Sequence, residues 1–317
     1  MAAPSRDPEA LAAQVRDGDR RAVARAISLI EDGDPAAAPL MAALWPHAGG
    51  AAVVGITGPP GVGKSTLVGA LVGAIRRVGR TVAVVAVDPS SPFTQGAVLG
   101  DRVRLVEHDT DEGVFFRSMG SRGRLGGIAE ATALAAAVLG AAGFDVVLVE
   151  TVGAGQSDIR IADLADVVVL ALQPGSGDSV QAIKAGVMEI PDVLAMTKCD
   201  LPGADALRAE LRLALSIDPE RAPLLVEVSA TTGQGVTELW DAVERVQGAL
   251  GPDGIAARRR SGAEREAIAI VAARAGARAR AAVADDPEVR AAIDRLAAGE
   301  LDPLALVQLL ERHTADR

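Results

Sequence analysis

Short apolar runs alternate with segments of helical periodicity through the middle of the chain. The runs are five to seven residues long and rich in β-branched residues, which is typical of parallel strands buried on both faces. The predicted strands are residues 51–57, 81–87, 146–150, 167–172, 193–197 and 224–228. Alternation of such strands with helices predicts an α/β fold, a doubly wound and mostly parallel sheet with helices on both faces.

The N-terminal part of the chain predicts helices only. Residues 8–31 carry apolar side chains on one helical stripe, and the pattern breaks at Gly18-Asp19, where Asp19 can cap a second helix. We therefore expect an N-terminal helical region at residues 1–48, followed by a central α/β domain at residues 49–250.

The C-terminal part is also helical in pattern. A breaker cluster lies at residues 248–254, and residues 255–284 then predict one long helix without proline. Asp286 and Asp302 each precede a proline, the order expected for a capping residue before the first helical position. The sequence thus predicts a separate C-terminal helical arm at residues 251–317.

The composition narrows the class of protein. Hydrophobic residues make up 49% of the 317 residues, enough for a sizeable core, but aromatic residues only 2%. The net charge of −10 and the scarcity of aromatic side chains argue against a nucleic-acid partner. Arginines 258–260 lie among alanines and acids, which favours a solvated helix face over a polyanion site. One cysteine, Cys199, and no apparent signal or membrane segment predict a soluble cytoplasmic protein without a membrane partner.

A glycine-rich run lies between the first predicted strand and a predicted helix. Residues 58–66, GPPGVGKST, match the phosphate-binding pattern G-x-x-x-x-G-K-[ST], and the strand and helix around them are the context that this chemistry requires. Loop amides and the helix N-terminus would bind phosphate, Lys64 would reach the β- and γ-phosphates, and the Ser65 hydroxyl would ligate Mg²⁺. The expected phosphate-binding residues are Gly58, Pro59, Pro60, Gly61, Val62, Gly63, Lys64, Ser65 and Thr66.

The identity of the base is suggested by the run Thr197-Lys198-Cys199-Asp200, which follows the fifth predicted strand. It fits the [NT]-K-x-D guanine reader, in which a carboxylate, here Asp200, accepts hydrogen bonds from two guanine donors that adenine lacks. Ser229 and Ala230 end the next strand, where such a pair often offers a backbone N–H to the guanine carbonyl. The alternative is that Asp200 only caps a turn before Pro202.

Acidic residues at strand ends are the candidates for the metal side of the site. Glu150 ends a hydrophobic strand and is followed by Gly153, whose amide would sense the γ-phosphate. Asp88 ends another strand, although it could equally form a turn before Pro89, and Asp101 lies in a nearby loop. We expect Ser65, Asp88, Asp101 and Glu150 to surround Mg²⁺.

Several longer segments, residues 87–104, 115–127, 150–158 and 174–192, resemble the MeaB/ArgK family. These are P-loop GTPases associated with adenosylcobalamin-dependent methylmalonyl-CoA mutase, and the resemblance extends from about residue 8 to residue 313. It implies the doubly wound G domain of the signal-recognition and MinD-like NTPases.

The resemblance also implies a function. The chain would be a GTP-hydrolysing chaperone that gates adenosylcobalamin delivery to a B12-dependent acyl-CoA mutase and protects that enzyme. GTP and GDP would be its ligands with Mg²⁺, a cobalamin adenosyltransferase would be a further partner, and the chain would form a homodimer. Lys184 corresponds to the lysine of a switch loop that communicates with the mutase.

Two features of the sequence leave the mechanism open. The guanine motif reads TKCD where many relatives have NKAD, so the tie between loops and the specificity for GTP could be looser. A water-positioning group and an arginine finger are not evident: Gln156 is a weak candidate, and Arg104, Arg117 and Arg122 could neutralise charge. We name Lys64, Glu150 and Arg104 as the catalytic candidates and expect slow turnover that a partner accelerates.

Other functions remain as alternatives. A GTPase that delivers nickel or zinc would need cysteine or histidine clusters, but the chain has one cysteine and three separated histidines. A regulator that binds GTP without useful turnover is a second alternative. A signal-recognition GTPase is excluded by the lack of a methionine-rich stripe. The mutase served could also be of the isobutyryl-CoA type.

Overall fold

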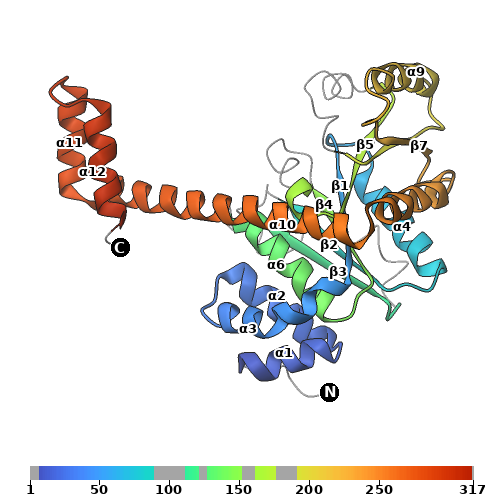
Figure 1. Cartoon of the computed structure of the whole chain (residues 1–317), viewed down its shortest axis with the longest axis horizontal. Helices are drawn as coiled ribbons and strands as arrows, with labels where there is room; N and C mark the ends of the chain where they lie inside the picture. Colours follow the sequence, from blue (N-terminus) through green and yellow to red (C-terminus); the bar gives the residue numbers. More distant parts are fainter. Residues whose placement is uncertain (1–6, 89–110, 121–126, 152–160, 176–190, 316–317) are drawn as a thin grey trace. The chain divides into compact units, whose positions relative to one another are not determined.

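The computed structural model describes residues 7–88, 111–120, 127–151, 161–175 and 191–315. Its centre is a seven-stranded sheet in the order β3-β2-β4-β1-β5-β6-β7, and every strand pair is parallel (Figure 1). This confirms the predicted α/β class. The strands are β1 (Ala52–Thr57), β2 (Val82–Asp88), β3 (Val114–Gly120), β4 (Val146–Thr151), β5 (Val167–Leu172), β6 (Val193–Thr197) and β7 (Leu224–Val228).

Strand β3 was not among the strands predicted from the apolar runs. Its sequence, VFFRSMG, has polar residues in the middle, and the strand lies at one edge of the sheet, where such residues are tolerated. Arg117 of β3 makes an ion pair with Glu31, whose side chain is only 4% exposed. The polar residue therefore serves a contact to an N-terminal helix that the local pattern does not reveal.

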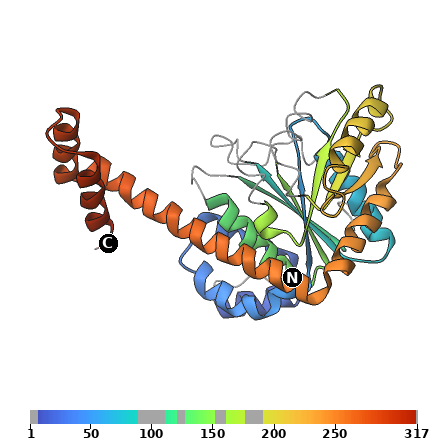
Figure 2. The same cartoon turned by 45° about the horizontal axis from the view of Figure 1, so that its top comes forward.

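Helices cover both faces of the sheet (Figures 1 and 2). On one face, α4 (Lys64–Arg77) and the start of α10 (Val236–Asp285) pack on alternate residues of the central strands. On the other face, α6 (Gly127–Ala141) covers β2 and β4, and α9 (Ala204–Leu215) covers β5 and β6.

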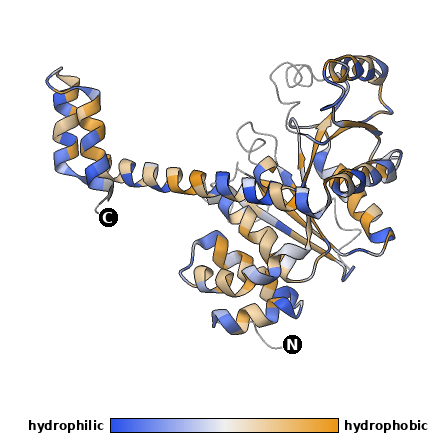
Figure 3. Ribbon diagram, in the orientation of Figure 1, coloured by the Kyte–Doolittle hydropathy of each residue, from blue (hydrophilic) through white to orange (hydrophobic). Residues whose placement is uncertain are grey.

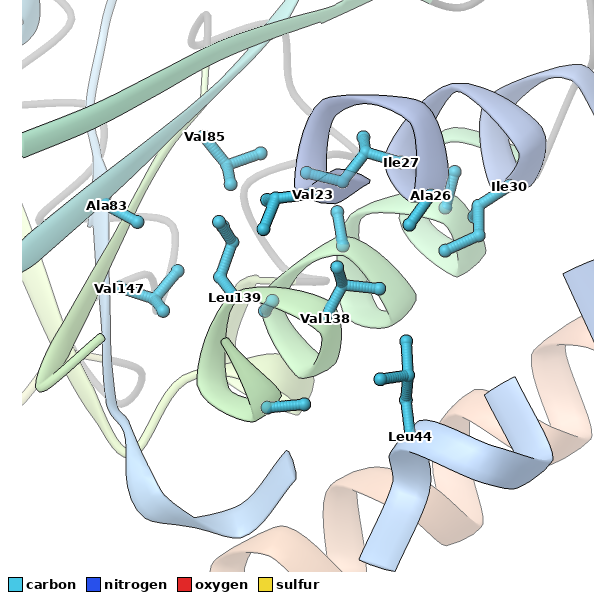
Figure 4. Packing of buried hydrophobic residues seen from close by; sticks show 14 of the residues in the cluster. Val23, Ala26, Ile27, Ile30, Leu44, Ala83, Val85, Val138, Leu139 and Val147 are labelled. Atoms are coloured by element: carbon cyan, nitrogen blue, oxygen red, sulfur yellow. The ribbon is translucent and has the colours of Figure 1, made fainter. Parts of the chain in front are cut away.

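The N-terminal helices belong to the same core. They are α1 (Pro8–Arg16), α2 (Arg20–Asp32), α3 (Ala37–Leu44) and the 3₁₀ helix η1 (Trp45–Gly50). Figure 4 shows Val23 and Ile27 of α2 beside Val138 and Leu139 of α6, over the strand residue Val85. The predicted cap is confirmed, because the Asp19 carboxylate accepts hydrogen bonds from the first backbone N–H groups of α2. Burial of these apolar faces fixes the helices on the sheet.

Helix α10 is held against the amino-terminal edge of the sheet by two arginines. Arg258 donates to both carboxylate oxygens of Asp192, at 2.8 and 2.7 Å, and Arg259 donates to both oxygens of Asp166, at 2.7 Å each. Close to them, a Cβ at Gly262 would overlap the carbonyl oxygen of Asp163. The prediction that these arginines form a solvated face is therefore wrong for Arg258 and Arg259.

The chain divides into two units, residues 1–263 and residues 264–317. The backbone of α10 is broken inside the first unit at Gly251, where φ is 61° and ψ is −179°, within the predicted breaker cluster. In the second unit the end of α10 packs with α11 (Pro287–Ala297) and α12 (Pro303–Ala315) through a small apolar cluster. Asp286 and Asp302 cap α11 and α12 as predicted. Among the described residues, no helix is both long and apolar enough to cross a membrane.

Candidate nucleotide site

The glycine-rich run lies where β1 ends and α4 begins. Its residues 58–63 form the loop, and Lys64 to Thr66 form the first turn of α4. Gly58 has φ of +142°, and a Cβ there would overlap the carbonyl oxygen of Ala171 in β5. Glycine is thus required for the loop to leave the sheet at this point, which places the loop at the carboxyl end of the central strands.

Lys64 and Ser65 are bonded to groups of the phosphate loop and of β4. Lys64 is 6% exposed, and its ammonium donates to the carbonyl oxygens of Gly58, at 2.6 Å, and Pro59, at 3.0 Å. The Ser65 hydroxyl donates to Oε1 of Glu150 at 2.6 Å. Glu150 is the fifth residue of β4, 8% exposed, and so lies directly beside the start of α4. A hydroxyl and a carboxylate at this distance are the oxygen donors that Mg²⁺ prefers.

The predicted guanine loop is bonded to the phosphate loop. The Thr197 hydroxyl lies 2.8 Å from the carbonyl oxygen of Val62 and 3.0 Å from that of Leu172, and Thr197 is 3% exposed. The Lys198 ammonium donates to the carbonyl oxygen of Gly61 at 2.9 Å. Lys198 has φ of 53°, and among the described residues no other non-glycine residue has a positive φ. Such strained positions cluster at functional sites.

The rest of the predicted guanine site lies at the ends of β6 and β7. Asp200 is exposed, in the turn after Lys198, whereas Ser229 is fully buried and directly follows β7. The backbone N–H of Cys199 donates to the carbonyl of Val228, which joins the two loops. Burial raises the pKa of the Cys199 thiol, with further contributions from Asp200 and Glu227, so this thiol is kept protonated.

An ion-pair cluster joins α9 to β7, close in sequence to the predicted guanine-binding residues. Arg208 of α9 binds both carboxylate oxygens of Glu227 in β7 and also binds Asp205. These hydrogen bonds raise the pKa of Arg208, and the bond from Arg208 lowers the pKa of Glu227. The cluster fixes α9, which begins four residues after Asp200, on the strand that leads to Ser229.

Of the remaining predicted site residues, two lie in the described part of the chain and the others lie outside it. Asp88 is the last residue of β2, and only its backbone is described. Arg117, one of the arginines considered for charge neutralisation, is bound to Glu31 and to the Ser28 hydroxyl. The remaining candidates lie outside the described residues: Asp101, Arg104, Arg122, Gly153, Gln156 and Lys184.

Comparison with known proteins identifies the family. The model of the family described as methylmalonyl-CoA mutase-associated GTPase MeaB matches residues 23–284. The chain belongs to the MeaB family. A Pyrococcus horikoshii protein named as a GTPase is 44% identical over 304 residues, which cover 94% of this chain and 95% of that protein. The GTPase ArgK of Escherichia coli is 35% identical over 252 residues, 76% of each chain.

A mammalian relative and a solved structure agree with this assignment. The mouse protein named methylmalonic aciduria type A homolog, mitochondrial, is 38% identical over 201 residues, which cover 61% of this chain and 48% of that protein. The solved structure of a LAO/AO transport system kinase superposes with a TM-score of 0.74 at 25% identity, over 98% of this chain and 99% of that one. This MeaB-family chain is a P-loop GTPase.

Sequence reasoning missed two polar residues next to the site. Thr57 and Thr151 end β1 and β4, and each adjoins a predicted site residue, Gly58 or Glu150. The signal was present in the sequence as two hydroxyls at the ends of otherwise apolar strands. It has no motif, so only the pairing of β1 with β4 brings the two residues together.

Proposed function

We propose that this GTPase is a chaperone of a B12-dependent acyl-CoA mutase, gating adenosylcobalamin delivery to that enzyme and protecting it. The observation that carries the proposal is the match of residues 23–284 to the family described as methylmalonyl-CoA mutase-associated. A methylmalonyl-CoA mutase is the expected partner, with a cobalamin adenosyltransferase as a third component. The cytoplasm is the expected location.

The geometry supports a division of roles within the nucleotide site. Lys64 is already held over the phosphate loop and would turn to the β- and γ-phosphates when GTP displaces the carbonyl contacts. Ser65 and Glu150 would hold Mg²⁺, which supplies charge neutralisation, with Asp88 and Asp101 as further acids. Asp200 would accept the guanine N–H groups, and Lys198 would lie along the base.

We expect slow intrinsic turnover. Among the described residues, Lys64 and Lys198 donate to carbonyl oxygens of the phosphate loop, while Arg117 is bound elsewhere. An arginine finger is worth roughly 10³–10⁵ in rate. Arg104 or a group on the partner would have to supply it, which links hydrolysis to partner binding. Gln156 and Lys184 are the proposed switch residues that convey nucleotide state to the mutase.

The proposal is tested by GTP hydrolysis with and without a B12-dependent acyl-CoA mutase from the same genome. GTP-selective turnover that rises several-fold with the mutase supports it, with ATP as the nucleotide control. Lys64→Ala serves as the second control, because it should abolish turnover with or without the mutase. Turnover that is selective for GTP but indifferent to every B12-dependent mutase would overturn the chaperone role and leave the GTPase.

A further inference from the structure

The strands that lead to the phosphate loop and to Glu150 are joined at their ends by two threonine hydroxyls. Thr151, the last residue of β4, donates from Oγ1 to Oγ1 of Thr57, the last residue of β1, at 3.0 Å. The two residues are 4% and 3% exposed. Apart from these threonines, Glu150 is the single polar residue of β1 and β4.

The hydroxyl pair continues the contact between β1 and β4 beyond their paired residues. The register of the two strands ends with Ile56 opposite Glu150, and Thr57 and Thr151 come next. After Thr57 the chain turns into the phosphate loop at Gly58. The bond therefore extends the contact between β1 and β4 to the last residue of each strand, directly before the phosphate loop.

The two last side chains of β4 are bonded on opposite faces of the sheet. Successive residues of a strand point to opposite faces. Glu150 meets Ser65 on the face that α4 covers, while Thr151 follows Val147 and Val149, which pack in the cluster with α6. The end of β4 is thus fixed from both sides, by Ser65 on one face and by Thr57 on the other.

Packing alone does not require hydroxyls at these positions. Valine has nearly the shape of threonine, and valine occupies three of the six positions of β4. Burying a hydroxyl costs free energy unless it is hydrogen-bonded, so two hydroxyls in an apolar sheet need a bond to offset that cost. What the bond adds over two valines is a defined distance between the strand ends.

We propose that Thr57 and Thr151 form a positioning pair for GTP hydrolysis. The bond sets the distance between the strand that enters the phosphate loop and the carboxylate that meets Ser65. Phosphoryl transfer depends on positioning and charge neutralisation rather than on covalent chemistry, so a shift of Glu150 lowers turnover. GTP affinity changes less, because the loop contacts of Lys64, Lys198 and Thr197 do not involve β4.

The test compares isosteric variants of the whole chain in intrinsic GTP hydrolysis, without any partner. Thr57→Val and Thr151→Val should each lower kcat about three- to tenfold, the value of one hydrogen bond. KM and GDP affinity should stay within about twofold, and the losses in kcat should be less than additive in the double variant, because both single variants remove the bond between the two threonines. Thr151→Ser, which keeps the hydroxyl, should restore most of kcat.

Thr132→Val is the matched control, because Thr132 is a 4% exposed threonine of α6 outside the nucleotide site. Its kcat should equal that of the unsubstituted chain. The proposal is overturned if Thr151→Val behaves like Thr132→Val, if the loss appears in KM instead of kcat, or if serine fails to rescue. If Thr151→Val does not fold, Thr57→Val provides the test, because it leaves β4 unchanged. A lower kcat at unchanged KM supports the proposal, and an unchanged kcat overturns it.

Discussion

At the scale of single residues, hydrogen bonds within the site hold the two side chains that begin α4. Lys64 is bound to two loop carbonyls and Ser65 to Glu150. The Ser65 hydroxyl and the Glu150 carboxylate are both oxygen donors of the kind that Mg²⁺ prefers.

Glu150→Gln tests this role of the carboxylate. The amide keeps an acceptor for Ser65 but loses the charge, so Mg²⁺ should bind more weakly while the fold persists. We expect kcat to fall at least about tenfold, since a hydrogen bond or contact to a charged group is worth about 1.5–3 kcal/mol. The measurement is GTP hydrolysis as a function of Mg²⁺ concentration. An unchanged Mg²⁺ dependence would contradict the assignment.

Thr197→Val tests the tie between the two loops. The Thr197 hydroxyl is buried between the carbonyls of Val62 and Leu172, so valine removes the bond without changing the shape. GDP affinity should fall by about two- to tenfold, for a bond worth about 0.5–1.5 kcal/mol. Fluorescent GDP analogues give the affinity, and Thr197→Ser should retain it. If Thr197→Val binds GDP as tightly as Thr197→Ser, the hydrogen bonds of the Thr197 hydroxyl are not needed for nucleotide binding.

At the scale of elements, the sequence predicted what local pattern determines. Six strands, the phosphate loop and the caps at Asp19 and Asp286 were predicted because apolar periodicity and capping residues are local signals. Strand β3 was missed because Arg117 breaks its pattern and binds Glu31, 86 residues away.

The two arginines of α10 show the same limit. They were predicted to face solvent because a run of like charges usually does. Their partners Asp192 and Asp166 lie 66 and 93 residues away in the sequence, where no local signal can point to them. The contact between Thr57 and Thr151 was missed for the same reason, because it depends on the order of the strands in the sheet.

Arg259→Ala tests how much this attachment of α10 stabilises the first unit. Asp166 is 1% exposed, and losing its bidentate partner leaves a buried carboxylate that retains the Val53 N–H. Removing one partner of such a pair costs about 3–5 kcal/mol when fully buried, and we expect about 2 kcal/mol here because Arg259 is partly exposed. Urea unfolding measures it. Arg260→Ala, at the exposed neighbour, should cost little, and similar losses in both variants would contradict the argument.

Glu227→Gln tests the ion pair between α9 and β7 through its pH dependence. The bond from Arg208 lowers the pKa of Glu227 below its ordinary value of 4.5, so its contribution is present above that value and is lost as the pH falls. The Tm of the variant should lie below that of the unsubstituted chain near pH 7, and the gap should narrow as the pH falls below 4.5, through the lowered pKa of Glu227. Glu210→Gln, on the exposed side of α9, is the control. A gap independent of pH would exclude this ion pair as its cause.

At the scale of the whole molecule, the C-terminal arm is the part whose role GTP hydrolysis does not explain. Within the unit of residues 264–317, Ile268 and Val271 of α10 are 63% and 64% exposed and lie one turn apart. Figure 3 shows hydrophobic residues along this stretch of α10 before α11. Isolated apolar side chains on a surface are ordinary, but two on one helical face, in a segment with a small core, are suited to a contact with a second copy.

The homodimer that the resemblance to the MeaB/ArgK family implies can be tested on this face. Ile268→Asp combined with Val271→Asp should convert the dimer to a monomer, because two buried carboxylates without partners would each cost several kcal/mol in the interface. Sedimentation velocity measures the oligomeric state at about 10 μM, a concentration at which a dimer with a stable interface of ordinary size is associated. Ala277→Asp lies on the opposite side of the helix and should leave the dimer intact.

The outcomes separate the dimer from its interface. If the unsubstituted chain is a monomer, the expected homodimer is contradicted. A dimer that survives the double substitution would move its interface away from α10. If the double variant is monomeric but keeps intrinsic GTP turnover, hydrolysis does not require the dimer. The arm would then act on the response to the mutase.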